Sequence, residues 1–506
     1  MKSKGICYLV GAGPGDVGLV TLKAKECIEK ADVLVYDALI SPEFVRWTKE
    51  GCELIYVGKR ADDHALTQDE TNELIVQKAQ EGKIVVRLKG GDPLIFGRGG
   101  EEAAKLADAG VRFEIVPGIS SAIAGPAYAG IPVTHREHCS QLTIFTGHED
   151  PTRGESRLDY EQLAKAPGTR VFLMGMRRLR EICDELMKYG AAPETPIGLV
   201  RWATTGNQTS VDGTLATIAD IAEEKNFKAP AVAVIGDVVK DRDKINWFEG
   251  RPLFGKKIVV TRTRSQASEL SRQLEELGAD VLEIPTIKIE HPDDKREFAE
   301  CVGSAHTYDW LVFTSPNGVE RFFEAFFSVY DDARSIGGVR IAAVGPGTAK
   351  KVNEYRLAVD LIPDKHVAEG LVEAFTEKES VENQTILWVR PQESRDTVVE
   401  GLTALGAIVD ECIAYKTVPE FEDPTGAKER FEKEGADLVT FVSSSAAKHF
   451  FALSLPWPEG CKVASIGPIT SATLNVIGKP ADVEAEEHNI PGLVEAVVKS
   501  FSTEQG

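Results

Sequence analysis

The sequence has no Cys-x-x-Cys pair, because its eight cysteines stand singly along the chain. This scatter excludes a disulfide framework and a zinc motif, and it fits thiols kept reduced. Apolar runs of membrane-spanning length are also missing, and the run that follows the N-terminus is too short for a signal-peptide core. We therefore expect a cytoplasmic protein without a membrane partner.

Positive charge is in short supply. The chain has 58 Lys and Arg against 79 Asp and Glu, which gives a formal net charge of −21. Such an excess of acid argues against general affinity for nucleic acid or anionic membranes and leaves small molecules as the expected partners. The remaining composition, 42% hydrophobic and 27% charged over 506 residues, is that of a globular protein with two to four domains.

Apolar runs alternate with helix-like segments through the first half, which predicts an α/β fold. A charged stretch with Pro and Gly near residue 250 predicts a linker. We therefore predict a domain over 1–245, a linker over 246–255 and a second domain over 256–503. Strands are predicted at 6–10, 33–36, 54–57, 84–88, 142–145, 171–174, 197–200 and 231–235, and helices at 19–30 and 68–81.

The second half repeats itself. Val260-Thr261-Arg262 returns 128 residues later as Trp388-Val389-Arg390, and Val344-Gly345-Pro346 returns 122 residues later as Ile466-Gly467-Pro468. A period of this length is too long for a solenoid and predicts two similar α/β lobes. Lobes joined by crossing strands leave a cleft between them, and ligands favour such clefts.

Gly11-Ala12-Gly13-Pro14-Gly15-Asp16 follows a predicted strand, as a dinucleotide-binding turn would. Asp16 occupies the position where Gly-x-Gly-x-x-Gly needs its third glycine, which argues against a nicotinamide cofactor. A tight turn capped by Asp16 is the simpler interpretation, since Asp is a good N-cap, and it leaves room for a ligand.

Several polar residues have both a functional and a structural interpretation. Asp37 and Lys59 stand at the carboxyl ends of predicted strands, where ligands collect in α/β sheets, although either could be solvated there. Arg98 and Glu101 are spaced for a local ion pair as well as for ligand contacts. His135 and His138 have the i, i+3 spacing of a metal site, but no second cluster completes it, so we expect a polar loop and no metal.

Hydroxyl groups recur where strands run into helices in the second half, at Thr314-Ser315-Pro316-Asn317, Ser443-Ser444-Ser445 and Gly467-Pro468-Ile469-Thr470. Such groups bind carboxylates at helix N-termini, and they cap helices equally well. Their presence in both predicted lobes favours a carboxylate-bearing ligand.

Taken together, these motifs resemble two known families. Gly11–Asp16, Tyr36-Asp37, Tyr56-Val57-Gly58-Lys59-Arg60, the run from Arg87 to Glu102, Val116–Ala122 and Ala129–Arg136 are similar to uroporphyrinogen-III C-methyltransferase over residues 5–245. Residues 255–500 resemble uroporphyrinogen-III synthase through Thr261-Arg262, Phe313–Asn317, Val344-Gly345-Pro346, Ala414–Thr417 and Ser465–Pro468.

For the first half, the resemblance implies a bilobed, tetrapyrrole-methylase-type α/β domain that forms a homodimer. It would use S-adenosylmethionine, releasing S-adenosylhomocysteine, to methylate uroporphyrinogen III twice to precorrin-2. Asp37 and Lys59 match one proposed proton-transfer pair, while Arg98 and Glu101 match another proposed base and anchor; arginine hardly ever deprotonates, so an anchor is the safer role for Arg98. Ala38 replaces a common arginine. The implied cofactor contacts are Pro14, Gly90, Gly91, Asp92, Ile95, Ser120, Ser121, Met174 and Ala203.

For the second half, the resemblance implies a two-lobed synthase that cyclises hydroxymethylbilane to uroporphyrinogen III, with Tyr415 as the acid for the leaving group. The expected whole is a bifunctional enzyme on the way to sirohaem and cobalamin, in which other proteins perform oxidation and metal insertion. A methyltransferase for another acceptor and a catalytically silent tetrapyrrole-sensing second half are the alternatives. The substrate's carboxylates would bind Arg262, Arg264, Thr314, Ser315, Ser443, Ser444 and Thr470.

Overall fold

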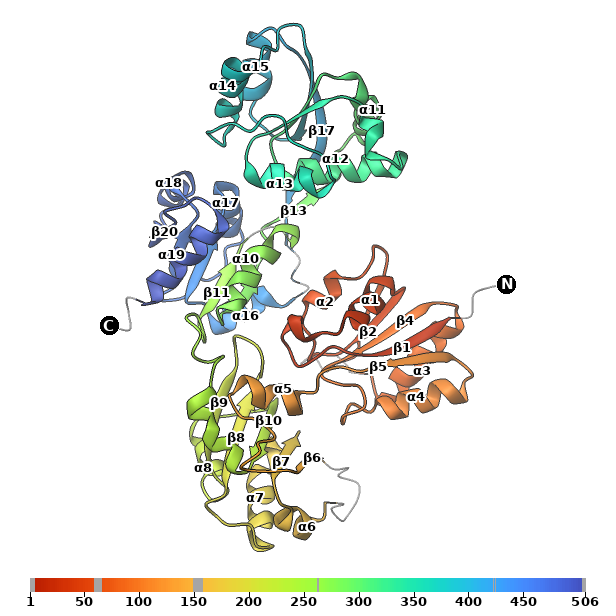
Figure 1. Ribbon diagram of the computed structural model, residues 1–506, viewed down its shortest axis with the longest axis vertical. Helices are drawn as coiled ribbons and strands as arrows, with labels where there is room; N and C mark the ends of the chain where they lie inside the picture. Colours follow the sequence, from red (N-terminus) through yellow and green to blue (C-terminus); the bar gives the residue numbers. More distant parts are fainter. Residues whose placement is uncertain are drawn as a thin grey trace.

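The computed structural model describes residues 5–58, 66–148, 158–261, 264–421, 423 and 425–502, with backbone alone over 264–268. Four five-stranded sheets, two in each half, form the framework of this part of the chain (Figure 1). The predicted α/β class is confirmed. No helix among the described residues has the length and apolar character needed to cross a bilayer.

The first sheet is parallel, with strand order β3-β2-β4-β1-β5. Its carboxyl edge therefore gathers the loops that follow β1, β2 and β4. The flanking helices begin at good caps: Thr67 and Glu70 form a capping box on α3, and Thr21 caps α1. The elements are β1 (Ile6–Gly11), α1 (Leu22–Lys30), β2 (Val33–Tyr36), α2 (Glu43–Arg46), β3 (Glu53–Tyr56), α3 (Gln68–Gln80), β4 (Ile84–Lys89), α4 (Gly99–Asp108) and β5 (Arg112–Val116).

The second sheet has the order β6-β7-β10-β8-β9 and is antiparallel except between β6 and β7. Helix α5 leads into it from the first sheet (Figure 1). All eight predicted strands of this half occur, with their ends shifted by two residues at most. The elements are α5 (Ser121–Tyr128), β6 (Leu142–Thr146), α6 (Tyr160–Lys165), β7 (Thr169–Leu173), α7 (Leu179–Lys188), β8 (Pro196–Arg201), β9 (Thr209–Thr214), α8 (Ile218–Glu224), β10 (Ala231–Ile235) and α9 (Arg242–Ile245).

The helix predicted at 19–30 starts later, at Leu22. Val17–Leu19 forms a separate 3-10 turn whose N-cap is Asp16, as the turn interpretation predicted: its Oδ1 accepts from the Gly18 backbone N–H at 2.7 Å. Asp16 Oδ2 also accepts from the Tyr128 hydroxyl at 2.6 Å, which ties this turn to α5.

Residues 246–255 pack against the first half. Trp247 donates from Nε1 to the Ala127 carbonyl at 3.1 Å, and the ring centroids of Trp247 and Phe248 lie 4.9 and 4.8 Å from that of Tyr128. Glu249 accepts from the Gln208 side chain at 3.1 Å. The buried Phe248 ring and the hydrogen-bonded Trp247 fix this segment, so this stretch is a folded joint between the halves.

The second half contains two sheets, with orders β12-β11-β18-β19-β20 and β13-β17-β16-β14-β15. Strands β13 and β17 run between the two lobes (Figure 1). The strands are β11 (Lys257–Val260), β12 (Asp280–Glu283), β13 (Ile287–Glu290), β14 (Trp310–Phe313), β15 (Arg340–Ala343), β16 (Thr385–Pro391), β17 (Ile408–Pro419), β18 (Leu438–Phe441), β19 (Lys462–Ser465) and β20 (Val483–Glu484).

The two lobes have the same strand arrangement, but neither lobe is formed by one sequence repeat alone. Strands β11, β18 and β19 are neighbours in one sheet, and their repeat partners β16, β14 and β15 are neighbours in the other. Each repeat therefore supplies one piece to each lobe. The helices are α10 (Arg264–Glu276), α11 (Lys295–Ser304), α12 (Pro316–Val329), α13 (Pro346–Glu354), α14 (Ala368–Lys378), α15 (Thr397–Ala404), α16 (Ala427–Glu434), α17 (Ser444–Ala452), α18 (Pro468–Ile477) and α19 (Ile490–Ser502).

Candidate active sites

A cavity of about 1660 Å³ lies between the two lobes of the first half and extends to the second half. The loops after β1, β2, β4, β7 and β8 line it, together with residues of α10 and α16. A space of this size accommodates a ligand larger than a typical small metabolite. Seven of the nine predicted cofactor residues line the cavity: Pro14, Gly90, Gly91, Ile95, Ser121, Met174 and Ala203.

Bare backbone forms one wall of this cavity. The Gly91 N–H donates to the Gly13 carbonyl at 2.7 Å and the Gly13 N–H donates to the Gly91 carbonyl at 3.2 Å, with φ at +67° and +75° respectively. At Gly118, a Cβ would lie 2.2 Å from the Gly91 oxygen. These three loops meet only because glycine supplies positive φ and leaves no side chain between them.

The two other predicted cofactor residues support the loops. Asp92 Oδ2 accepts from the Gly118 N–H at 3.0 Å, and its Oδ1 accepts from the Leu94 N–H at 2.7 Å. Ser120 caps α5 by accepting from the Ala122 N–H at 3.3 Å. Both side chains hold the backbone on which a ligand would lie.

Large apolar side chains face the cavity. Ile95, Phe96 and Met174 are 41%, 39% and 51% exposed, values at which an apolar side chain has surface left to bury against a ligand. Phe96, Met174, Trp202 and Thr204 also have positive φ, between 47° and 71°. Such strain in non-glycine residues costs free energy and collects at ligand sites.

Asp37 lines the cavity at the end of β2. Its Oδ2 lies 3.5 Å from Arg87 Nη2, and its side chain is 29% exposed. Arg87 belongs to a buried cluster behind the cavity: Glu102, which is fully buried, accepts from Arg87 Nε at 3.2 Å and from Lys89 Nζ at 2.9 Å. Burial, followed by the nearby Arg87 charge, lowers the pKa of Lys89.

Sequence reasoning missed this cluster, although the sequence holds a sign of it. Arg87 and Lys89 alternate on an apolar strand and so point to the same face of the sheet. Two cations on one buried face require a buried anion, which Glu102 provides.

Arg98 and Glu101 form a bidentate ion pair, with Arg98 Nε and Nη2 at 3.0 and 2.7 Å from the two carboxylate oxygens. Hydrogen bonding to Glu101 raises the pKa of Arg98, and the same contact lowers the pKa of Glu101. Both side chains are more than half exposed, and neither lines the cavity. The local ion pair allowed by their spacing is present, and a catalytic role for them stays a prediction. Lys59 lies outside the described residues.

In the second half, the Tyr415 hydroxyl lies 2.9 Å from Ser315 Oγ. Tyr415 sits on β17 and is 5% exposed, and Ser315 ends the loop after β14. Burial raises the pKa of Tyr415 although hydrogen bonds with Ser315 and Asn317 lower it, so the phenol keeps its proton at neutral pH. The structure thus joins two residues that the sequence placed 100 positions apart.

The other hydroxyl residues predicted to bind substrate either cap helices or are buried in a lobe. Ser443 caps α17 by accepting from the Ala446 N–H at 3.2 Å, and Ser315 caps α12 in the same way. Ser444 Oγ donates to the Ile469 carbonyl at 3.2 Å. Thr314 is half-buried, but Thr470 is 4% exposed, so its side chain points into the lobe. Carboxylate binding by this set stays a prediction. Arg262 and the side chain of Arg264 lie outside the described residues.

The histidine pair has a third member that the sequence did not reveal. Asp241 and the two histidines bring one ligand atom each within 4.8 Å of one another, and His138 Nε2 lies 3.3 Å from Asp241 Oδ2. His135 Nδ1 accepts from the Glu137 N–H at 3.2 Å. That hydrogen bond places the proton of a neutral His135 on Nε2, where it competes with a metal ion.

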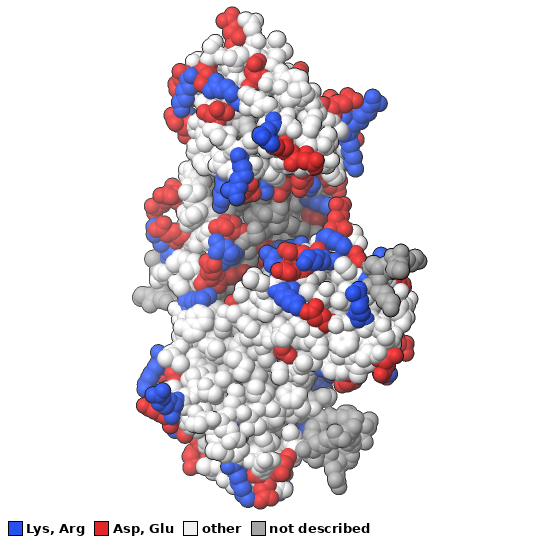
Figure 2. Space-filling view, turned by 45° about the vertical axis from the view of Figure 1, so that its right-hand side comes forward, with Lys and Arg blue, Asp and Glu red and all other residues white. Residues whose placement is uncertain are grey.

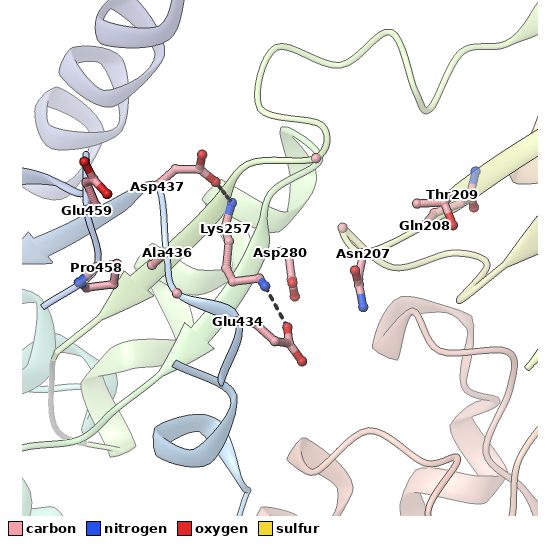
Figure 3. A pocket seen from close by; sticks show the side chains of 13 residues that line it. Asn207, Gln208, Thr209, Lys257, Asp280, Glu434, Ala436, Asp437, Pro458 and Glu459 are labelled. Atoms are coloured by element: carbon pink, nitrogen blue, oxygen red, sulfur yellow. Dashed lines mark hydrogen bonds and ion pairs between the residues drawn. The ribbon is translucent and has the colours of Figure 1, made fainter. Parts of the chain in front are cut away.

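Charged side chains of both signs crowd the middle of the molecule, where the two halves meet (Figure 2). A second cavity of about 340 Å³ lies at this junction, between Asn207 and the end of α16 (Figure 3). Lys257 spans its wall, with Nζ 2.6 Å from Glu434 and its backbone N–H 2.7 Å from Asp437 Oδ2. Among the described residues of this wall, Lys257 is the one cation, and it is already paired.

Each half matches a known family. Residues 7–219 match the family of Tetrapyrrole (Corrin/Porphyrin) Methylases, and residues 268–495 match Uroporphyrinogen-III synthase HemD. The chain is 35% identical to the porphyrin biosynthesis protein HemD of Ruminiclostridium josui, over 96% of this chain and 94% of that protein.

Two further relatives are methyltransferases by name. The S-adenosyl-L-methionine-dependent uroporphyrinogen III methyltransferase of Methanosarcina barkeri is 56% identical over 47% of this chain and 94% of its own length. The uroporphyrinogen-III C-methyltransferase of Bacillus subtilis is 42% identical over 66% of this chain and 69% of its own length. The chain therefore belongs to the tetrapyrrole methylases through its first half and to the uroporphyrinogen-III synthases through its second.

Proposed function

We propose that this chain is a bifunctional tetrapyrrole enzyme: its second half cyclises hydroxymethylbilane to uroporphyrinogen III, and its first half methylates that product twice to precorrin-2. The observation that carries the proposal is the large cavity of the first half, where bare glycine backbone, exposed apolar side chains and Asp37 meet. It combines room for a macrocycle with the features of a cofactor site.

The residues present fit S-adenosylmethionine, which when bound supplies an electrophilic methyl group on a positively charged sulfur. The backbone of Gly90 and Gly91 can approach such a ligand closely, because the carbonyl and amide edges there carry no side chains. Ile95 and Met174 provide apolar walls, and Ser121 and Ala203 complete the lining. Fixing the donor in line with a carbon nucleophile removes much of the entropic barrier to transfer.

Asp37 is the residue we assign to proton removal. A macrocycle that gains a methyl group from a sulfonium donor also gains its positive charge, so a proton must leave the macrocycle to restore neutrality. Asp37 lines the cavity, and its Oδ2 lies 3.5 Å from Arg87 Nη2, which places its carboxyl group beside the space for the macrocycle, where it can accept that proton. Arg98, which lies outside the cavity lining, is assigned to an outer contact with the substrate's carboxylates, and Glu101 is assigned to holding the Arg98 side chain through their ion pair.

In the second half, we assign Tyr415 as the acid that protonates the departing hydroxyl of hydroxymethylbilane, so that water leaves as the ring closes. The raised pKa of Tyr415 keeps the proton available, and Ser315 at 2.9 Å orients the hydroxyl. The remaining task is to hold one folded conformer, which depends more on positioning than on acid strength. In the cell we assign the product to the sirohaem and cobalamin branches, in a cytoplasmic homodimer.

The test uses the full chain with hydroxymethylbilane and S-adenosylmethionine, followed by mass spectrometry of the product. We expect cyclised product that carries two added methyl groups. Asp37→Asn should give cyclised, unmethylated product, and Tyr415→Phe should give slow cyclisation while added uroporphyrinogen III is still methylated. Methylation of added uroporphyrinogen III without any cyclisation by the wild-type chain would instead favour a silent, tetrapyrrole-sensing second half.

A further inference from the structure

The cations that line the large cavity are of two kinds. Most are already neutralised: Lys89 is paired with Glu102, Arg430 with Asp280, and Arg46 with Glu283. Within the described part of the chain, three lining cations have no ion pair with a carboxylate: Arg177, Arg201 and Arg251. Unpaired arginines that converge on one cavity are free to bind acidic groups of a ligand, because each guanidinium presents several donors in a plane.

Arg251 is the most informative of the three, because it belongs to the joint between the halves. Its guanidinium carbon lies 4.7 Å from the Trp247 ring centroid and 4.9 Å from that of Phe248. Both rings are themselves held against α5 by Tyr128. The two rings hold the guanidinium in place, and within the described part of the chain its N–H groups make no hydrogen bond, so they are preorganised for a carboxylate.

The two other arginines belong to the second lobe of the first half. Arg177 lies in the turn after β7, and Arg201 ends β8. The Nε atom of Arg201 is buried and has no hydrogen-bond partner. A buried donor without a partner costs free energy, which a bound acceptor would recover.

We propose that Arg251 binds a carboxylate arm of the macrocycle in the methylation cavity, with Arg177 and Arg201 holding further arms. This inference rests on the proposed function, whose substrate bears eight carboxylates on a ring too large for a small cofactor pocket. It means that the joint between the halves is part of the methyltransferase substrate site. The fused second half then contributes to methylation by fixing the joint, because the Leu253 N–H, two residues after Arg251, donates to the Leu277 carbonyl at 2.9 Å.

The experiment compares three variants of the full chain. Arg251→Met keeps the apolar contact with the rings and removes the charge. Arg251→Lys keeps the charge but loses the planar set of N–H donors that can bind both oxygens of a carboxylate. Arg272→Met is the matched control, since Arg272 lines the same cavity but is paired with Glu269 and Glu276. The measurements are steady-state methylation of added uroporphyrinogen III and, without S-adenosylmethionine, binding of the fluorescent octacarboxylate uroporphyrin III.

For Arg251→Met we expect KM for uroporphyrinogen III and the dissociation constant of uroporphyrin III to rise about tenfold, the usual effect of losing one charged hydrogen-bond partner. The kcat value and KM for S-adenosylmethionine should stay within about twofold, since neither depends on this arm. For Arg251→Lys, KM for uroporphyrinogen III and the dissociation constant of uroporphyrin III should lie between those of the wild type and of Arg251→Met. Both values for Arg272→Met should equal those of the wild type.

Unchanged macrocycle affinity in Arg251→Met, with an active wild type, would overturn this inference alone. A similar loss in Arg272→Met, or a fall in thermal stability and in S-adenosylmethionine affinity together with the macrocycle effect, would assign Arg251 a structural role and overturn it as well. A wild-type chain that binds uroporphyrin III through Arg251 but transfers no methyl group would overturn the proposed function instead.

Discussion

The buried carboxylate of Glu102 offers a sharp test of how the methylation site is supported. Glu102 Oε1 accepts from Arg87, Lys89 and Gln68 at 3.2, 2.9 and 3.1 Å, and the Arg87 and Lys89 side chains are 5% and 6% exposed. Glu102→Gln keeps the volume and removes the charge, so Lys89 loses its counter-ion and Arg87 keeps only the longer contact with Asp37. Breaking a buried pair in this way costs about 3 to 5 kcal/mol.

For the first half that cost corresponds to a fall in melting temperature of roughly 6 to 20 °C, at about 2 to 4 °C per kcal/mol for a domain of this size. Differential scanning calorimetry of the full chain would measure it. Glu101→Gln is the matched control, because the neighbouring carboxylate is 56% exposed and its pair contributes no more than about 1 kcal/mol.

The pH dependence adds a second readout. Burial lowers the pKa of Lys89, and Glu102 opposes that effect, so Glu102→Gln should lower it further. A lysine whose pKa is lower in the folded than in the unfolded chain reduces the free energy of unfolding at every pH below its folded pKa. That reduction disappears as pH rises from the folded pKa to the ordinary value of 10.5. The variant should therefore regain stability in alkali relative to the wild type. Equal melting temperatures for Glu102→Gln and Glu101→Gln at neutral pH would refute the reasoning.

Three further predictions concern separate parts of the chain. Gly118→Ala places a methyl group 2.2 Å from the Gly91 oxygen, so calorimetry should show destabilisation of about 1 to 3 kcal/mol. Isothermal titration should also show weaker binding of S-adenosylhomocysteine. Unchanged binding would contradict the role of the glycine backbone as a wall of the cofactor site. Ser443→Ala removes the N-cap of α17 and should cost about 1 kcal/mol in denaturant unfolding, whereas no change would mean that water replaces the cap. Hydrogen bonds from the Ile84 N–H, and then from Lys49, lower the pKa of Asp32, so this carboxylate stabilises the fold above pH 3.8 and stops doing so as pH falls through its folded pKa. In Asp32→Asn the free energy of unfolding should therefore depend less on pH in that acid range. The same pH dependence in the variant and the wild type would contradict this role of Asp32.

The sequence predicted the strands of the first half well because each is a short apolar run bounded by turn residues. The start of α1 was missed because Val17–Leu19 continues the apolar pattern, and only the competing cap at Thr21 sets the boundary. Boundaries depend on such local hydrogen bonds, which periodicity does not register.

Site residues were predictable where chemistry and backbone geometry coincide, as at Gly90 and Gly91. The sequence could not tell which polar residues face the cavity: Asp37 does, whereas Arg98 and Glu101 pair with each other on the surface. It also predicted residues 246–255 only as a linker, because the stacking of Arg251 on aromatic rings depends on how α5 packs. Contacts between segments far apart in sequence determine both features, namely which polar residues face the cavity and how residues 246–255 pack.

The exchange of pieces between the two repeats has a consequence for synthesis of the chain. Strand β11 needs β18 as its neighbour, and Ile258 pairs with Leu438, 180 positions later. The sheet formed by β13 to β17 is complete once residue 419 has left the ribosome, while β11 and β12 still lack the other three strands of their sheet. Because domains fold as they emerge, the newborn chain holds an apolar strand with one unpaired edge, that of β11 facing away from β12, until residue 441 follows. A ribosome that stalls within α16 or β18 would leave that strand edge open to pairing with another chain.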